Sequence, residues 1–434
     1  MGTLKIAVIG AGLTGLTAAY KLSQQGHEIT IYEESKTPGG LASAFKAGSE
    51  NLDRFYHHMF VSDSDLLDLI DELSLHNALN WYEPKNAIYL EDSLFPFTSP
   101  FDLLRFTPLR FSSRVRTGLL VLRSGFIKDY RPLESVRAKD WIINRSGQEA
   151  YDKIWSPLLK SKFDMDSDLV SGTWIWNKFK LRGSSRGKNI AKEQLGYLDG
   201  GFILLIERLI EKIRQNGGNL LLENSVKSMA KSQDGRWEIS SEKGRSLFDK
   251  VLFTAAPEIL ANSCSGLSQE YRAALRSIKY KANLCLALEL KESLSPYYWI
   301  TVAQEGFPFV LVIEHTNLVG LRGYGSHIIY LSRYLDASDP LFSASDSEIE
   351  EKFTDGLKRI FPDFEADYIK KATVSRVRYA QPVVKIGCSE NIPDIETPLD
   401  GLFLASMPQI YPEDRGLNYA VRLGRQAADR LIRR

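Results

Sequence analysis

Cysteine is scarce in this sequence, and long hydrophobic runs are missing. Cys264, Cys285 and Cys388 lie far apart and form no CxxC pair, which argues against a disulfide framework or a zinc site and favours a reducing compartment. No apolar run approaches the roughly 20 residues that a membrane-spanning helix needs. The sequence starts without a charged leader and apolar segment, and position 6 is not the Ser or Thr that myristoylation requires. We therefore expect a cytoplasmic protein with no bound metal.

An excess of one charge is also missing, since 55 Lys and Arg residues face 54 Asp and Glu residues and leave a formal net charge of +1. This balance gives no general reason to expect a nucleic-acid partner. A length of 434 residues is enough for more than one domain, and a hydrophobic content of 44% is typical of a globular protein with a buried core.

A glycine motif stands near the start of the sequence, between two segments of regular structure. Residues 4–9 form a short apolar run typical of a buried strand, and residues 13–25 have helical periodicity. Between them, the GxGxxG motif places Gly10 at a tight turn, Gly12 where the backbone approaches a pyrophosphate, and Gly15 where the helix packs on the strand. The free backbone N–H groups at the start of this helix, which favour phosphate binding, include those of Leu13 and Thr14.

An acidic residue follows the motif at the spacing that a dinucleotide site requires. The second predicted strand, residues 28–32, ends at Glu33, whose carboxylate can accept hydrogen bonds from ribose hydroxyl groups. The same carboxylate disfavours a 2′-phosphate, so NADP is not the expected ligand. A lone GxGxxG can be a chance glycine turn, but the strand, motif, helix and Glu33 stand in register and predict a dinucleotide site.

A second glycine pair, Gly39-Gly40, follows Glu33 by six residues and continues into Leu41 and Ala42. Paired glycines let a loop run close beneath a pyrophosphate and the isoalloxazine edge, although a plain turn is the alternative. A ribose-binding Glu with Gly-Gly at this distance resembles the flavin amine oxidase, phytoene desaturase and protoporphyrinogen oxidase superfamily, whose cofactor fold UDP-galactopyranose mutases share. The resemblance implies FAD as the cofactor and an α/β fold, in which a Rossmann-type, glutathione-reductase-2-like FAD-binding domain carries an inserted α+β substrate domain.

The resemblance extends along the chain in the segments that hold the cofactor. Residues 197–202 and the amphipathic segment after them resemble the family's second cofactor segment, which implies that the backbone of Val226 meets the adenine. Residues 401–407 and 416–421 resemble the family's last strand, loop and helix. Many relatives carry a Gly-Asp or Gly-Glu pair in this loop where this chain has Ser-Met, so a Ser hydroxyl or backbone groups would replace that acidic contact. The implied contacts in this last part are Ser406, Asn418, Tyr419 and Ala420.

The family pattern implies two domains that are each built from separate parts of the chain. Residues 1–75, 195–262 and 375–434 are expected to form the FAD-binding domain. A mostly helical insertion over residues 76–194 and a strand-rich insertion over residues 263–374 are expected to form the substrate domain.

Residues 53–60 hold the densest cluster of candidate catalytic side chains. This segment follows the Gly-Gly loop at the distance where relatives place residues beside the flavin, and it contains His57 and His58. Neighbouring residues on a strand point to opposite sides, so at most one of these two imidazoles faces the ring. A core or hinge role is the alternative. Arg415, in the loop before the closing helix, is the third candidate, with a solvated loop as its alternative.

Two other features bear on the substrate. Amine-oxidising relatives often place a lysine near flavin N5, and residues 279–285 offer Lys279 and Lys281 in an ambiguous register. A basic stretch with interleaved apolar residues indicates contact with anionic lipid or with a phosphorylated substrate, and a solvated helical face is the alternative. Its basic residues are Arg105, Arg110, Arg114, Arg116, Arg123, Lys128, Arg131, Arg137 and Lys139.

These patterns favour an FAD-dependent oxidoreductase. In the leading interpretation, a small organic substrate loses a hydride to flavin at a C–N or C–C bond, and the electron acceptor is left open. A redox-neutral flavoenzyme acting on a nucleotide sugar, as in UDP-galactopyranose mutase, is the first alternative. A non-catalytic binding protein with a flavin fold is the second.

Overall fold

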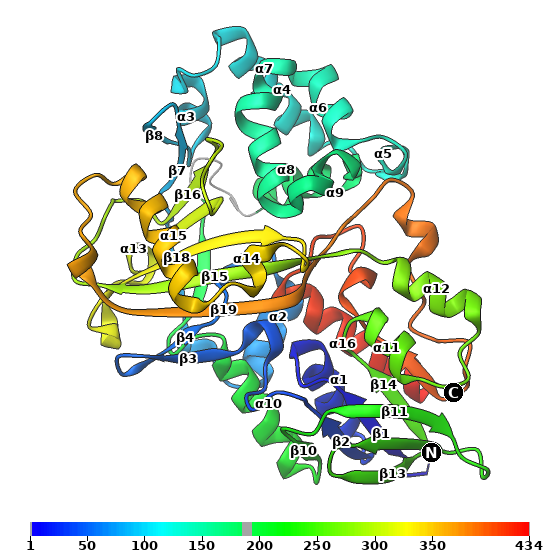
Figure 1. The fold of residues 1–434 in the computed structure, drawn as a ribbon. Helices are drawn as coiled ribbons and strands as arrows, with labels where there is room; N and C mark the ends of the chain where they lie inside the picture. The colour runs from blue at the N-terminus through cyan, green and yellow to red at the C-terminus, as the bar shows by residue number, and fades with distance from the viewer. Residues whose placement is uncertain (1, 185–192, 434) are drawn as a thin grey trace.

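A five-stranded parallel sheet forms one end of the molecule in the computed structural model, which describes residues 2–184 and 193–433 (Figure 1). The strand order is β10-β2-β1-β14-β20, so segments far apart in the sequence supply one sheet. This arrangement confirms the predicted α/β fold with a parallel, Rossmann-type sheet. The strands are β1 (Lys5–Ile9), β2 (Glu28–Tyr32), β10 (Asn219–Leu221), β14 (Lys250–Phe253) and β20 (Leu402–Leu404).

Different layers cover the two faces of this sheet. Successive side chains of β1 point to opposite faces, so Ile6 and Val8 pack against helices while Ala7 and Ile9 pack against a second sheet. The helices are α1 (Leu13–Gln24), α10 (Ile203–Gln215) and α16 (Leu417–Ile432). The second sheet is antiparallel and consists of β11 (Val226–Lys231), β12 (Trp237–Ser241) and β13 (Gly244–Phe248).

A seven-stranded sheet crosses the middle of the molecule in the order β19-β15-β18-β17-β16-β7-β8 (Figure 1). In β15, Leu284 and Leu286 pack against helix α15 (Asp346–Ile360), while Cys285 and Ala287 face the core shared with the FAD-binding part. This alternation explains why β15 is apolar on both faces. The strands are β7 (Asn86–Leu90), β8 (Ser93–Pro96), β15 (Tyr280–Leu290), β16 (Trp299–Val302), β17 (Leu311–Glu314), β18 (His327–Leu335) and β19 (Ile369–Pro382).

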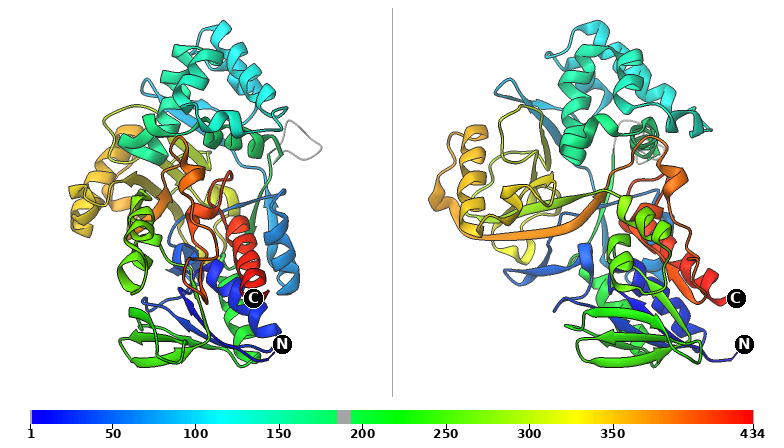
Figure 2. Two further views of the ribbon diagram at one scale, coloured as in Figure 1. Left: turned by 90° about the vertical axis from the view of Figure 1, so that its right-hand side faces the viewer. Right: turned by 45° about the vertical axis from the view of Figure 1, so that its right-hand side comes forward.

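A helical unit lies at the end of the molecule opposite both termini (Figures 1 and 2). Its core is rich in tryptophan, with Trp141, Trp155, Trp174 and Trp176 buried together. Residues 185–192, at the end of the expected helical insertion, lie outside the described residues. The helices are α3 (Pro100–Arg105), α4 (Phe111–Ser124), α5 (Arg131–Glu134), α6 (Ala138–Ser146), α7 (Gln148–Ala150), α8 (Ser156–Phe163) and α9 (Gly172–Ser184).

Smaller elements connect the two large sheets. The sequence predicts a mostly helical insertion over residues 76–194, yet its first part, residues 79–96, holds β6 (Leu79–Tyr82), β7 and β8, because β7 and β8 complete the edge of the seven-stranded sheet. The remaining strands are β3 (Ala44–Ala47), β4 (Glu50–Asp53), β5 (Met59–Phe60), β6 (Leu79–Tyr82) and β9 (Leu195–Leu198). The remaining helices are α2 (Ser64–Glu72), α11 (Pro257–Ser263), α12 (Gln269–Ser277), α13 (Thr316–Val319) and α14 (Pro340–Ser343).

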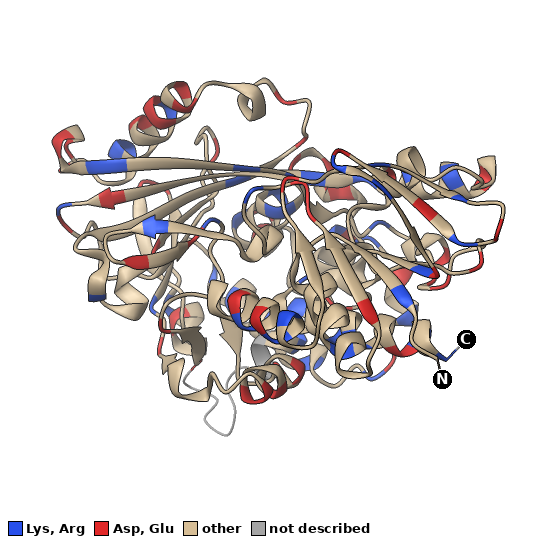
Figure 3. Ribbon diagram, turned by 90° about the horizontal axis from the view of Figure 1, so that it is seen from below, with Lys and Arg blue, Asp and Glu red and all other residues tan. Residues whose placement is uncertain are grey.

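Two overall properties of the surface follow from this fold. Seen from below, acidic and basic residues are interspersed over the FAD-binding end (Figure 3), in keeping with the small net charge. Across the described part of the chain, every helix is too short or too polar to cross a lipid bilayer.

Candidate cofactor and active site

The glycine motif forms an open cradle at the start of α1. Gly10 has φ +109, and a Cβ atom there would lie 2.7 Å from the Thr254 hydroxyl, so only glycine fits this turn. By contrast, nothing lies within 4 Å of a Cβ atom built on Gly12, and no side chain caps the first turn of α1. The space beside Gly12 is therefore open, and no side-chain cap occupies the N–H groups at the start of α1, as a phosphate-binding helix start requires.

Glu33 lies beside this cradle. Its carboxylate accepts a hydrogen bond from the Ala11 N–H at 2.9 Å through Oε2 and from the Ser35 N–H at 2.9 Å through Oε1. These two bonds fix the carboxylate, and each oxygen retains capacity for a ribose hydroxyl. The segment before β11 lies against the same loop, because the Asn224 N–H donates to the Glu33 carbonyl at 2.9 Å. Val226, two residues further on, begins β11, and its contact with the adenine stays a prediction.

The Gly-Gly loop closes the cradle from the other side. The Gly39 N–H donates to the Ala11 carbonyl at 2.8 Å, and a Cβ atom on Gly40 would lie 3.5 Å from the Gly12 Cα. Gly39 and Gly40 have φ +111 and +56, which glycine adopts without strain. Leu41 and Ala42 complete a short 3₁₀ turn after them. The structure thus brings the glycine motif, Glu33 and residues 39–42 together, and their open, N–H-rich surface fits an adenine dinucleotide.

The carboxyl-terminal residues predicted to contact the cofactor lie in two places. Ser406 is buried after β20, and its N–H donates to the Gln409 side chain at 2.6 Å, so that backbone group is not free for a ligand. Asn418 is buried in the first turn of α16, and its side-chain oxygen accepts from the Leu66 N–H at 3.0 Å, which ties α16 to α2. Tyr419 and Ala420 follow in the same uncapped first turn.

The two adjacent histidines point into different surroundings. The buried Nδ1 atom of His57 has no hydrogen-bond partner among the described residues. Burial and then the charge of Arg415 lower the pKa of His57 to about 4, so this imidazole is neutral at pH 7. His58 instead lies among aromatic rings, with its Nδ1 3.1 Å from the Tyr298 hydroxyl and its ring 5.8 Å from that of Trp299. His57 and His58 therefore do not share one surface.

Arg415 is held inside the molecule rather than on a solvated loop. Its Nε donates to the Gln381 side chain at 3.0 Å, and its Nη2 donates to the Tyr334 hydroxyl. The Nζ atom of Lys162 lies 3.3 Å from the same hydroxyl and 4.6 Å from the Tyr334 ring centre. Burial alone would raise the pKa of Tyr334, but the charges of Arg415 and Lys162 outweigh burial and lower it.

Arg415, Lys162 and Tyr334 thus form one cluster, and the charges of Arg415 and Lys162 both lower the pKa of His57. Sequence reasoning missed Lys162 and Tyr334, because they come from α8 and β18 and only the tertiary fold places them together. The neighbouring Asp414 is also buried, and the charges of Lys178, Lys162 and Arg415 overcome burial and lower its pKa.

A cavity of about 360 Å³ adjoins this cluster at the end of β19. Polar and charged side chains of Arg415, Asp414 and Gln381 reach it from one side, and the Met407 loop borders it from another. Lys279 also lines it. The cavity lies between the end of β19 and the loop that follows β20.

The lysines of β15 have partners of their own. Lys281 is fully buried, with Nζ 2.7 Å from Asp166 and 2.9 Å from Asp336, and Lys279 lies 2.8 Å from Asp166. The structure therefore resolves the ambiguous register of this segment and places both lysines in one ion-pair network with two aspartates.

Asp53 joins three parts of the chain beneath the site. Its carboxylate accepts from the Tyr197 hydroxyl at 3.0 Å and from the Phe202 N–H at 3.2 Å, and the Tyr330 hydroxyl donates to its carbonyl at 2.6 Å. Burial raises the pKa of Asp53 to about 7, although both bonds to its carboxylate act in the opposite direction.

Known proteins are similar to this chain in sequence and in fold. Zeta-carotene desaturase from Zea mays is 25% identical over 257 residues, which span 54% of this chain and 45% of that protein. The Solanum lycopersicum zeta-carotene desaturase is 21% identical over 479 residues, 98% of this chain and 80% of the relative.

Solved structures match the whole fold. An Exiguobacterium sp. 255-15 protein assigned as a protoporphyrinogen oxidase superimposes with a TM-score of 0.80 at 18% identity, covering 99% of each chain. Reduced UDP-galactopyranose mutase gives a TM-score of 0.77 at 17% identity, covering 99% of this chain and 96% of the other. The model of the family described as flavin containing amine oxidoreductase matches residues 13–432. Since that match spans nearly the whole chain and the cradle fits a dinucleotide, this protein belongs to the flavin containing amine oxidoreductase family of FAD-dependent oxidoreductases.

Proposed function

We propose that the chain oxidises a small organic substrate that carries an anionic group, removing a hydride at a C–N or C–C bond. The observation that carries this proposal is the pair of partly buried cations, Lys162 and Arg415, which both donate to the Tyr334 hydroxyl, with Arg415 also lining the 360 Å³ cavity. Partly buried cations attract a carboxylate or phosphate more strongly than exposed ones, because less water screens them.

The residues of the cluster divide the work that such a reaction requires. When bound, FAD supplies the acceptor for the hydride. Arg415 and Lys162 hold the anionic group and so orient the reacting carbon. The substrate must also lose a proton from nitrogen or the adjacent carbon, and the partnerless Nδ1 of neutral His57 is suited to accept it.

The test is anaerobic bleaching of the flavin by candidate substrates. Amines, polyenes, porphyrinogens and anionic derivatives of each are mixed with the holoprotein, and the visible flavin band is followed. We expect an anionic substrate to bleach the band, and Arg415→Gln to weaken its apparent affinity by more than about tenfold without loss of FAD. Lys160→Gln, on the same helix as Lys162, is the matched control, because Lys160 pairs with Glu305 instead of Tyr334. Equal affinity in Arg415→Gln and in the control would contradict the anionic substrate.

A redox-neutral reaction on a nucleotide sugar is the second candidate. Two observations favour it: the fold is shared with reduced UDP-galactopyranose mutase, and the same two cations suit a diphosphate. This candidate requires activity only after the flavin has been reduced. If no substrate bleaches the flavin while the dithionite-reduced protein isomerises a UDP-sugar, oxidation is the wrong reaction class.

A further inference from the structure

The exposed large hydrophobic side chains are concentrated on one part of the helical unit. Single exposed apolar residues are ordinary, whereas a contiguous group marks an interaction surface. Of eleven such side chains among the described residues, seven lie within 26 consecutive positions. We call these seven the α3–α4 face: Phe101 (65% exposed), Leu104 (44%), Phe111 (68%), Val115 (37%), Leu119 (42%), Leu122 (65%) and Phe126 (82%).

The spacing along α4 turns these residues toward solvent as one stripe. Positions 111, 115, 119 and 122 recur every three or four residues, so they share one side of the helix. Thr117, Leu120 and Ser124 occupy the opposite side and are buried in the helical unit. Helix α4 is therefore anchored by one face and presents a second, apolar face that the described chain does not cover.

Helix α3 extends this stripe sideways. A Cβ atom on Gly118 of α4 would lie 3.8 Å from the Leu103 side chain, and the Arg114 guanidinium donates to the Leu104 carbonyl at 2.8 Å. These contacts hold α3 against α4, so Phe101 and Leu104 lie next to the stripe and the seven side chains form one surface.

The surface is also strongly basic. Six Lys and Arg residues stand between positions 101 and 128 against one carboxylate, Asp102, which gives this segment a formal charge of +5 in a chain of +1. Arg116 and Arg123 are seven residues apart and so share one side of α4, at the margin of the stripe. The structure shows no ion pair within the described residues for Arg105, Arg110, Arg123 or Lys128.

We propose that the α3–α4 face docks on the surface of an anionic lipid bilayer. An apolar stripe bordered by arginines matches the boundary between acyl chains and phosphate headgroups. Helix α4 has 14 residues and several arginines, so it lies along the membrane and does not cross it. The helical unit is at the opposite end from the FAD-binding sheet, and docking by this face leaves that sheet in water (Figures 1 and 2).

The proposal is independent of the substrate and is tested by sedimentation of the FAD-loaded protein with vesicles. Phosphatidylcholine vesicles with and without phosphatidylglycerol are compared at low and high salt. We expect the protein to bind the anionic vesicles at low salt. Binding to the neutral vesicles, and binding to the anionic vesicles at high salt, should each be lower by more than about tenfold. Leu122→Ser/Phe126→Ser is expected to reduce binding to anionic vesicles by more than about tenfold, because two large apolar side chains no longer insert.

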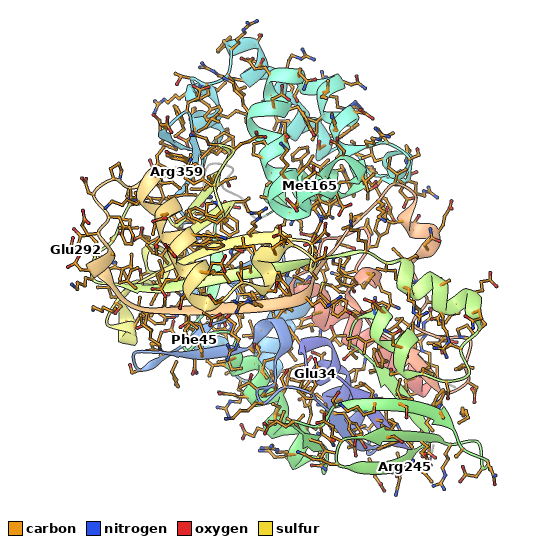
Figure 4. The ribbon with its side chains drawn as sticks, viewed as in Figure 1. Glu34, Phe45, Met165, Arg245, Glu292 and Arg359 are labelled. Atoms are coloured by element: carbon orange, nitrogen blue, oxygen red, sulfur yellow. The ribbon has the colours of Figure 1, made fainter. Side chains whose placement is uncertain are left out.

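Matched controls separate docking from a general change in the protein. Met165→Ser/Leu321→Ser removes two other exposed apolar side chains, of 83% and 46% exposure, and should bind as the wild type does. Met165 lies where the helical unit meets β18, away from the α3–α4 face (Figure 4). Arg105→Gln/Arg110→Gln/Arg123→Gln should lose anionic binding. Arg208→Gln/Arg214→Gln/Arg245→Gln removes the same charge at the FAD-binding end and should keep that binding, since Arg208 and Arg214 lie on α10 and Arg245 lies on β13 (Figure 4).

The melting temperature and the FAD content are recorded for every variant. Because the substituted side chains are exposed, neither quantity should change. Absence of binding to anionic vesicles, equal binding to neutral ones, or unchanged binding by Leu122→Ser/Phe126→Ser would each overturn the proposal. The proposal would also be overturned if the wild-type protein did not bind vesicles but self-associated through this face, since a second copy of the chain would then cover it.

Discussion

A Cβ atom built on Gly15 would lie 2.2 Å from the carbonyl oxygen of Gly10. That separation is far below contact distance, so α1 can approach β1 only because residue 15 is glycine. Gly12 differs, because its Cβ position is open. Two glycines of one motif are thus required for different reasons: Gly15 for the fold and Gly12 for the ligand.

This difference predicts opposite behaviour for two substitutions. Gly12→Val should fold with the thermal stability of the cofactor-free protein but fail to retain FAD, because the branched side chain fills the space for the pyrophosphate. Gly15→Val should lose several kcal/mol of stability, about 3 or more, since backbone must shift. Flavin absorbance per protein and melting curves with and without FAD distinguish the two. A Gly12→Val protein with stoichiometric FAD would refute the assignment of the cradle.

The Asp53 carboxylate is predicted to hold two separate segments of the FAD-binding part together. Asp53→Ala leaves the Phe202 N–H and the Tyr197 hydroxyl buried without their acceptor, which should cost about 2–4 kcal/mol of unfolding free energy. Asp53→Asn retains an oxygen acceptor in the same place and should cost clearly less. Urea unfolding measures both, and equal losses would show that the bonds themselves contribute little.

The cofactor end of the molecule could be predicted from the sequence in some detail. Local signals are strong there: β1 is an apolar run, the glycines follow at fixed spacing, and Glu33 ends β2. Backbone geometry within about 40 residues determines this part, so pattern and spacing are sufficient.

The substrate side could not be predicted in the same way. Tyr334 and Lys162 come from β18 and α8, and neither carries a local motif. Residues 79–96 were expected to be largely helical but form strands, because pairing with β16 at the edge of the larger sheet outweighs local preference. The α3–α4 face could be predicted only in part. Its basic residues are visible in the sequence, but only the fold shows that its apolar side chains are exposed.

His57 should make stability depend on pH in the acidic range. Its pKa is about 4 in the folded protein against an ordinary 6.5, so the unfolded chain binds a proton that the folded chain resists. The associated stability is present above pH 6.5 and is lost as pH falls from there toward 4, by up to about 3 kcal/mol. Urea unfolding across this range should show a weaker loss in His57→Gln than in the wild type. Parallel curves for the two proteins would show that the imidazole is not held in a buried, cationic environment.

Tyr334 should ionise at a lower pH than an ordinary tyrosine. The charges of Arg415 and Lys162 lower its pKa below 10.0, although burial acts in the opposite direction. The difference in tyrosinate absorbance between the wild type and Tyr334→Phe isolates this one hydroxyl during an alkaline titration. We expect the difference to develop below pH 10.0 in the wild type, and at a higher pH when Lys162→Gln is introduced into both proteins, since one of the two charges that oppose burial is then gone. Lys160→Gln, which leaves the Tyr334 contacts intact, should not move the transition. A wild-type difference that develops only above pH 10.0 would mean that the two cations do not converge on this hydroxyl, and the anionic site proposed beside it would lose its basis.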